Sequence, residues 1–259
     1  MIMSQSPSHV NGKLYVVGIG PGSLEHMTLR AHTVIKEADV ILGNGTYLDQ
    51  IKDLISVQQV FRSSMGHEVE RAKKAIDLAV DNKVVMVSGG DSNIYGMAGL
   101  VLEVARQVDL SVDIEIVPGI TALSAAASLL GAPVVTDFAV ISLSDLLTPW
   151  EIIEKRLHAA TEADMIIGIY NPKSRQRNTN FQKAIKIIRR SRVDTAPVGI
   201  VRNALRTEGE SVVVTTLGNI LDHDDEVDMR TTVIIGNSES GIWGYRIITP
   251  RGYHKKYDY

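Results

Sequence analysis

The sequence predicts an α/β protein with mostly parallel strands. Short β-rich runs alternate along the chain with amphipathic helical patterns, which is typical of repeated strand–helix units. The chain has 259 residues, of which 44% are hydrophobic and 22% are charged, as in ordinary folded proteins. This length allows two domains of roughly 120 residues each. We expect a first domain at residues 12–118 and a second at residues 119–246.

The first half predicts strands and helices in near alternation. The strands are expected at 13–18, 39–42, 57–61, 84–88 and 113–117, and the helices at 28–37, 67–81 and 95–108. In the helix at 67–81, Val69, Ala72 and Ile76 share one face at helical spacing. The remaining positions carry charged side chains that we assign to solvent or to a neighbouring element: Glu70, Arg71, Lys73 and Lys74.

The second half restarts the same pattern after a segment of small residues. Strands are expected at 138–143, 165–170, 198–201, 212–217 and 232–236, and helices at 150–160 and 178–190. The segment 118–133 contains two prolines and two glycines, which predicts a turn, a buried helix of small residues and a second turn. We place the domain junction in this segment.

Composition excludes several classes of protein. A net charge of −3, from 27 Lys+Arg and 30 Asp+Glu, argues against a nucleic-acid partner held by many phosphate contacts. The chain has no cysteine, which removes disulfides, thiolate metal sites and cysteine nucleophiles. The seven histidines never take a helical ligand spacing, so we expect no protein-bound metal. With no signal-like start and no membrane-spanning pattern, we expect a cytoplasmic protein with no membrane partner.

A glycine-rich turn at residues 18–22 follows the first predicted strand, where open α/β sheets bind ligands. The motif departs from a dinucleotide-binding turn, because Ser23 stands at the third glycine position and Pro21 removes a backbone donor. The acidic residue expected after a second strand is also absent. A turn that only reverses the chain is the other reading of this motif.

Two further loops have the same position, after a strand and before a helix. In the loop at 89–96, two glycines precede Asp91, whose carboxylate could accept from an ammonium or hydroxyl group. Alternatively, Asp91 only orders its turn or caps the next helix. In the loop at 118–122, a proline and a glycine precede small residues. These allow either close helix packing or the approach of a flat ring.

Together these motifs resemble the S-adenosylmethionine-dependent tetrapyrrole methyltransferases of the cobalamin and sirohaem pathways. The resemblance extends over residues 12–243 and includes Tyr170-Asn171-Pro172 and the run at 231–236. Stretches at 91–102, 142–150, 170–175 and 201–204 resemble the members that methylate carbon 17 of precorrin-3B or cobalt-factor III and contract the ring. A methylase of another ring carbon is the alternative within the family. Ser92 departs from the proline usual in this family, which predicts a less rigid loop.

The resemblance implies two αβα domains with an intervening cleft that holds S-adenosylmethionine, the methyl donor that becomes S-adenosylhomocysteine. It implies that the methionine part contacts Gly89, Gly90 and Asp91. The other residues implied to bind the cofactor are Pro21, Ile94, Thr121, Ala122, Tyr170, Asn171, Val201 and Thr232. A sulfonium cofactor needs carbonyls and a carboxylate more than anion-binding amides, which agrees with Pro21 and Asp91.

The acceptor tetrapyrrole carries several carboxylates, and cations follow two predicted strands. Lys173, Arg175 and Arg202 are the candidates to bind these carboxylates, with Arg177 and Arg206 nearby in the sequence. An ordinary solvated loop is the other interpretation. Any cobalt would arrive inside the substrate.

Ring contraction moves protons, so a general acid or base is expected, whereas methyl transfer depends mainly on positioning. The candidates are His67, at a predicted helix start, with Asp137 and Ser142 as weaker ones. A surface or capping role is the other reading for His67.

Two other classes of function remain open from the residues alone. A nicotinamide oxidoreductase would require the missing third glycine and ribose carboxylate, and a non-catalytic tetrapyrrole carrier would require only the basic residues. The family resemblance also implies a homodimer. Ile242 and Trp243 lie beyond the last predicted strand and would be covered by a second copy, or would close the second domain's own core.

Overall fold

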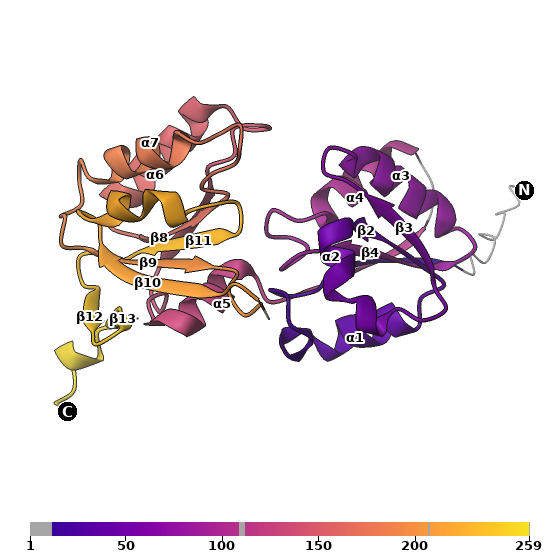
Figure 1. Cartoon of the computed structure of the whole chain (residues 1–259), viewed down its shortest axis with the longest axis horizontal. Coiled ribbons are helices and arrows are strands. Elements are labelled where there is room, and N and C mark those ends of the chain that lie inside the picture. The colour runs from indigo at the N-terminus through magenta and orange to yellow at the C-terminus, as the bar shows by residue number, and fades with distance from the viewer. Residues whose placement is uncertain (1–11, 109–111, 207, 259) are drawn as a thin grey trace, which may run out of the picture. The chain divides into compact units, whose positions relative to one another are not determined.

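The computed structural model describes residues 12–108, 112–206 and 208–258. The chain divides into two compact units, Met1–Thr121 and Ala122–Tyr259 (Figure 1). The division lies three residues beyond the expected junction, just before the helix of small residues.

The first unit contains a five-stranded parallel sheet. Its strands are β1 (Lys13–Gly18), β2 (Val40–Asn44), β3 (Gln59–Ser63), β4 (Lys83–Ser88) and β5 (Asp113–Val117), in the order β3-β2-β4-β1-β5. All four pairings are parallel, as predicted. The strands are continuous apolar runs because helices cover both faces of the sheet.

Helices that follow β1 and β2 pack on one face, and helices that follow β3 and β4 pack on the other. The first pair is α1 (Leu29–Lys36) and α2 (Gly45–Gln50), and the second is α3 (Glu68–Leu78) and α4 (Ala98–Val108). Neighbouring strands therefore send their chains to opposite faces, which opens a crevice at the carboxyl edge of this sheet. The short α2 and the 3₁₀ turns η1 (Leu24–His26) and η2 (Lys52–Leu54) were not predicted.

Local residue chemistry accounts for several helix ends. The Thr28 side chain accepts from Ala31 N at 3.2 Å and begins α1, as expected of an N-cap threonine. In contrast, α4 begins at Ala98 rather than at residue 95, because the loop before it holds Tyr95 at φ 53°. A left-handed backbone conformation interrupts a right-handed helix.

The second unit also has a five-stranded sheet, but the prediction of mostly parallel strands is wrong for it. The strands are β7 (Phe138–Ser142), β8 (Ile166–Tyr170), β9 (Pro197–Arg202), β10 (Ser211–Thr216) and β11 (Thr231–Ile235), in the order β10-β9-β11-β8-β7. Only the β7–β8 pairing is parallel. Among the described residues, no α-helix follows β9, and β10 returns antiparallel beside it. The chain then reaches β11 through the 3₁₀ segment η3 (Ile220–Glu226), and β11 lies antiparallel between β9 and β8.

Helices cover both faces of this second sheet as well. The expected helix of small residues is α5 (Ala122–Leu130), and α6 (Trp150–Glu162) and α7 (Asn180–Ile188) pack on the opposite face (Figure 1). Strand glycines make room for α5: a Cβ at Gly199 would lie 2.2 Å from Leu130 Cδ1. The close packing of small residues is therefore realised in α5.

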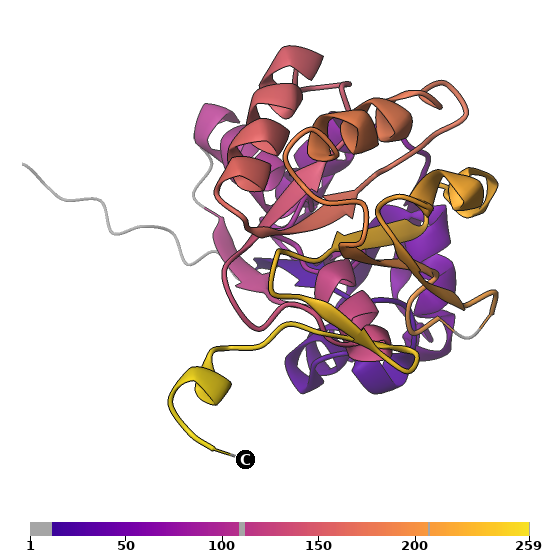
Figure 2. The same ribbon diagram turned by 90° about the vertical axis from the view of Figure 1, so that its left-hand side faces the viewer.

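A small three-stranded sheet was not predicted. It pairs β6 (Gly131–Ala132) with the hairpin of β12 (Gly241–Trp243) and β13 (Arg246–Ile248), and the turn η4 (Tyr253–Lys255) follows beyond it (Figure 2). Trp243 is 66% exposed. The alternative that Trp243 closes the core of its own unit is therefore wrong. Within the described residues, no helix combines the length and the apolar character that a membrane crossing requires.

Candidate active site

The glycine-rich turn after β1 and the loop after β4 are joined through their backbones. Gly20 N donates to Gly90 O at 3.0 Å, and Gly90 N donates to Gly20 O at 2.9 Å. Both glycines have positive φ values, 77° and 65°, which favour glycine. The two loops thus form one rigid strip at the carboxyl edge of the first sheet.

The loop after β5 lies against the same strip. A Cβ at Gly119 would lie 2.3 Å from Gly90 O and 2.6 Å from Gly18 O. At Gly89, a Cβ would lie 2.3 Å from the ring of Tyr47. A side chain at Gly119 would separate the loop backbones, and one at Gly89 would displace the Tyr47 ring, so both glycines have a structural role whether or not a ligand is bound.

Asp91 connects two of these loops. Its Oδ1 accepts from Asn93 N at 2.8 Å and its Oδ2 accepts from Gly119 N at 3.0 Å. The turn-ordering interpretation of Asp91 is therefore realised. Each carboxylate oxygen retains a lone pair for a further donor, since an ionised carboxylate accepts about four hydrogen bonds. Beside it, Ile94 and Tyr95 are 41% and 56% exposed, which leaves apolar surface next to a partly exposed carboxylate.

Ser92 stabilises the same loop in a way that proline could not. The residue is fully buried, and its hydroxyl donates to Val117 O at 3.3 Å, the last residue of β5. The serine thus adds a hydrogen bond between the β4 loop and the adjoining strand.

In the second unit, the residues implied to bind adenosine gather at one edge of the sheet. Thr232 pairs with Val201 across β11 and β9, and the next residue of β11 pairs with Ile169, which precedes Tyr170. The Tyr170 hydroxyl accepts from Leu123 N at 2.6 Å, in the first turn of α5. The register therefore brings Tyr170, Thr232 and Val201 together. The Tyr170 hydroxyl lies at the start of α5, whose first residue is Ala122.

Asn171 and Ser142 lie at this same edge. Asn171 has φ 50°, and its Nδ2 donates to Ser142 Oγ at 2.9 Å. A non-glycine residue with positive φ costs of order 1 kcal/mol or more, and such residues gather at functional sites.

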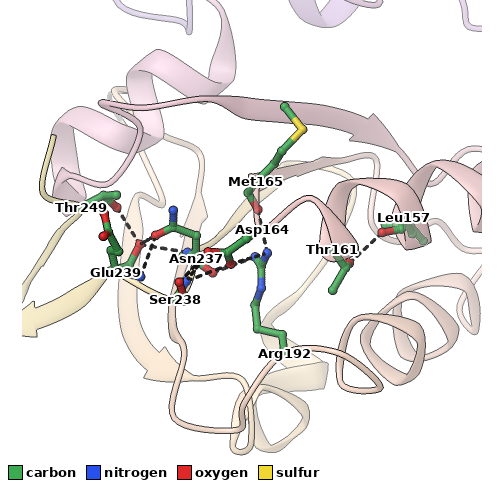
Figure 3. Close-up of polar contacts among 11 residues, drawn as sticks. Leu157, Thr161, Asp164, Met165, Arg192, Asn237, Ser238, Glu239 and Thr249 are labelled. Carbon is green, nitrogen blue, oxygen red and sulfur yellow. Dashed lines mark hydrogen bonds and ion pairs between the residues drawn. The ribbon is translucent and has the colours of Figure 1, made fainter. Parts of the chain in front are cut away.

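Asp137 lies at the opposite edge of the sheet. Asp137 directly precedes β7, which begins at Phe138, and Ser142 is the last residue of β7. Phe138 pairs with Ile166, whereas Ser142 pairs with Tyr170. At Asp137's edge, a network among Asp164, Arg192 and Ser238 braces the chain (Figure 3). The structure therefore does not bring Asp137 and Ser142 together.

Two of the three proposed carboxylate-binding cations already have carboxylate partners in the chain. Lys173 Nζ lies 2.6 Å from Asp224 Oδ2, and Arg202 Nε lies 2.9 Å from Asp228 Oδ2. Arg175 is exposed. Two of the cations in these loops are thus paired with carboxylates of the folded chain.

His67 lies just before α3, but its side chain caps no backbone group of that helix. Its Nδ1 is 2.8 Å from Glu70 Oε2, and its side chain is half exposed. The capping interpretation is therefore wrong, whereas the surface interpretation agrees with the half-exposed ring, which a ligand can reach.

Sequence reasoning missed Arg71, which was assigned to solvent or a neighbour and is only 6% exposed. No local signal marks its burial, since the exposed Lys73 flanks the buried Ala72 in the same way. Among the described residues, no three His, Asp or Glu side chains gather as a metal site.

Comparisons with known proteins agree with this geometry. A family model described as Tetrapyrrole (Corrin/Porphyrin) Methylases matches residues 13–221. Over 95% of its length, the chain is 51% identical to the cobalamin biosynthesis protein CbiHC of Archaeoglobus fulgidus. It spans 54%, about half, of that relative.

A second relative is matched over nearly its whole length. The chain is 46% identical, over 93% of its own length, to a probable cobalt-factor III C(17)-methyltransferase of Salmonella typhimurium, and covers 99% of it. The crystal structure of the methyltransferase CobJ covers 92% of this chain with a TM-score of 0.86 and 32% identity, and is itself covered completely. The expected α/β fold and the family resemblance are both confirmed: the chain belongs to the tetrapyrrole (corrin/porphyrin) methylase family.

Proposed function

We propose that the chain methylates carbon 17 of precorrin-3B or cobalt-factor III with S-adenosylmethionine and contracts the ring to form precorrin-4 or its cobalt form. The observation that carries this proposal is the 46% identity to the Salmonella relative, whose length is covered almost completely. The whole set of ordered motifs also lies at the carboxyl edge of the first sheet and the Tyr170 edge of the second.

The residues present fit the cofactor. The partly exposed Asp91 carboxylate has acceptor capacity left for an ammonium or hydroxyl group, and the exposed Ile94 supplies apolar contact beside it. In the second unit, the strand register brings the buried Tyr170, Thr232 and Val201 together, and the backbone near them is proposed to contact the base. When bound, S-adenosylmethionine supplies a methyl group on a sulfonium; the chain's residues orient it and exclude water.

Ring contraction needs proton transfer, for which His67 and Ser142 are our candidates. His67 is exposed and held by Glu70 at 2.8 Å, and Ser142 is positioned by Asn171. A general acid or base contributes about 10²–10⁴-fold in rate. If His67 acts in this step, His67→Gln releases methylated product that retains the full macrocycle. If Ser142 acts, Ser142→Ala does so instead.

The proposed function is tested with the purified chain, oxygen excluded, on cobalt-factor III and on metal-free precorrin-3B. We expect one added methyl group at carbon 17 and a contracted ring with one of the two, assigned by mass and NMR. A methylated product with an intact macrocycle would favour the methylase of another ring carbon. Tighter calorimetric binding of NAD than of S-adenosylhomocysteine would favour an oxidoreductase.

We also propose that the chain forms a homodimer through its C-terminal hairpin. Ile242, Trp243 and Tyr245 are 45%, 66% and 67% exposed, and such a patch is typical of an interface. Light scattering at micromolar concentration should give twice the 28.3 kDa chain mass. Trp243→Ser should give the single-chain mass, whereas a parent protein of 28.3 kDa would contradict the proposal.

A further inference from the structure

A pocket of 420 Å³ opens where β3 ends and α3 begins. Phe61, Ser63, Ser64, His67, Arg71 and Lys74 are among the residues that line it. A second pocket of 680 Å³ shares Ser63 and Ser64 and extends to Thr46, after β2. The two form a continuous depression along the carboxyl ends of β2 and β3, elements that lie next to α3 in Figure 1.

Arg71 lines this pocket with a side chain that is 5% exposed. Its Nη1 donates to Ser63 Oγ at 2.5 Å and to Ser64 O at 3.5 Å. Its Nη2 reaches only the sulfur of Met97, at 3.6 Å, and its Nε has no hydrogen-bond partner among the described residues. The nearest carboxylate, Glu68 Oε1, is 3.9 Å away, beyond hydrogen-bond distance.

The other well-buried arginine shows how unusual this is. Arg192 donates to Gly236 O at 2.8 Å and to Met165 O at 2.9 Å, and it faces Asp164 at 3.4 Å. Arg71 has no such set of oxygen acceptors. Burial lowers the pKa of the Arg71 guanidinium, because removal from water disfavours the charged form, and the charge of Glu68 opposes this only partly. A buried guanidinium with so few acceptors can stabilise an anion that enters the pocket.

The rest of the pocket adds two cations, Lys74 and Arg62, and one carboxylate, Glu70, which lies 2.8 Å from His67 Nδ1 rather than against Arg71. Lys74 Nζ lies 3.4 Å from the centre of the Phe61 ring and forms no ion pair with any described residue. Arg62 is paired with Asp49 at 2.5 Å. Ser63 Oγ accepts from Arg71, and the nearest acceptor for its own proton is 3.5 Å away, so this hydroxyl is available to donate to a ligand.

We propose that this pocket binds one carboxylate side chain of the acceptor tetrapyrrole, through Lys74 and the two serine hydroxyls, with the buried charge of Arg71 behind them. The inference rests on the proposed function, because it takes the acceptor to be a polycarboxylate. It moves carboxylate recognition away from Lys173 and Arg202, which their own chain already neutralises. Poor screening at a buried site makes Arg71 effective even without direct contact.

The test compares Arg71→Met and Lys74→Met with Lys73→Met, an exposed lysine of the same helix that does not line the pocket. We expect the KM for cobalt-factor III to rise about ten- to hundredfold for Arg71→Met and about three- to tenfold for Lys74→Met. The control should leave it unchanged. The dissociation constant of S-adenosylhomocysteine should be unchanged in all three variants, and the KM should depend less on salt without Lys74.

Stability separates a binding role from a structural one. If Arg71 serves ligand binding, Arg71→Met keeps or raises the Tm, because methionine removes a buried charge that has no carboxylate within hydrogen-bond distance. A lower Tm with unchanged KM would overturn the proposal, and so would an unchanged KM for Lys74→Met, which lies at the surface and leaves the fold intact.

A binding titration with uroporphyrin III, a tetrapyrrole octacarboxylate, keeps the inference separate from the proposed function. If the parent chain binds this pigment but methylates neither precursor, the proposed function fails. The dissociation constants of Lys74→Met and Lys73→Met for uroporphyrin III then still test whether the pocket binds a carboxylate. Equal affinities of the two variants, or no binding to the parent, would refute it.

Discussion

Asp91 braces two loops of the first unit, and its substitution tests whether the same carboxylate also holds the cofactor. Asp91→Ala removes the acceptors of Asn93 N and Gly119 N, at 2.8 and 3.0 Å. The contact to Asn93 is exposed, so water replaces that acceptor. The contact to Gly119 is partly buried, and a lost hydrogen bond to a charged group costs about 1.5–3 kcal/mol. We expect the free energy of unfolding to fall by about 2 kcal/mol.

Asp91→Asn separates the shape of this side chain from its charge. The amide has a single oxygen, so it retains one of the two backbone hydrogen bonds, and its NH₂ group cannot accept the other. We expect about half the loss of stability seen with alanine. The affinity for S-adenosylhomocysteine should fall in both variants by about ten- to hundredfold, because both lack the negative charge of the Asp91 carboxylate.

Urea unfolding followed by circular dichroism gives the stability, and calorimetry gives the dissociation constant of S-adenosylhomocysteine. Asp77→Ala is the matched control, since Asp77 is an exposed carboxylate on α3. The control should change neither quantity. If both Asp91 variants fold and still bind S-adenosylhomocysteine within twofold of the parent, Asp91 only orders its loops, and its assignment to the cofactor site is wrong.

Three further substitutions test the structural account. Tyr170→Phe leaves the buried Leu123 N without its acceptor and should lower the free energy of unfolding by about 1–3 kcal/mol; an unchanged urea midpoint would show that the hydroxyl does not cap α5. Gly199→Ala places a methyl 2.2 Å from a leucine carbon of α5, and the overpacking should lower the free energy of unfolding by about 1–3 kcal/mol. Thermal unfolding measures this loss, and an unchanged stability would contradict the close packing of α5 on the strand. Hydrogen bonds from Arg30 and a neighbouring lysine lower the pKa of Glu115 from 4.5 to about 2. Glu115→Gln should therefore lower the free energy of unfolding most near neutral pH. The difference between parent and variant should diminish as pH falls from 4.5 towards about 2; a pH-independent difference in urea unfolding would exclude this carboxylate as the cause.

The sequence by itself determined the family, the α/β class and the loops that follow β1, β4 and β5. Glycine, proline and strand-like runs are local signals, and a positive φ or a buried parallel strand needs particular residues at particular places. Gly20 and Gly90 show this, since their positive φ values suit glycine. The same locality explains the small-residue helix α5, which packs close to glycines of the neighbouring strands.

Strand direction and charge pairing were decided only by the tertiary structure. The sequences of β9, β10 and β11 are compatible with either parallel or antiparallel pairing, because side chains alternate between faces in both kinds of sheet. Lys173 and Arg202 resembled free cations until the fold placed Asp224 and Asp228 beside them.

Arg71 also shows that local sequence does not determine the partners of a charged side chain. The sequence left it facing either solvent or a neighbouring element, and the packing of α3 made it a buried cation with few partners. The partners of a charged side chain come from segments far apart in the chain, whereas helical periodicity reports only which face is apolar. Electrostatics at this pocket therefore follow from tertiary contacts that no local pattern of residues specifies.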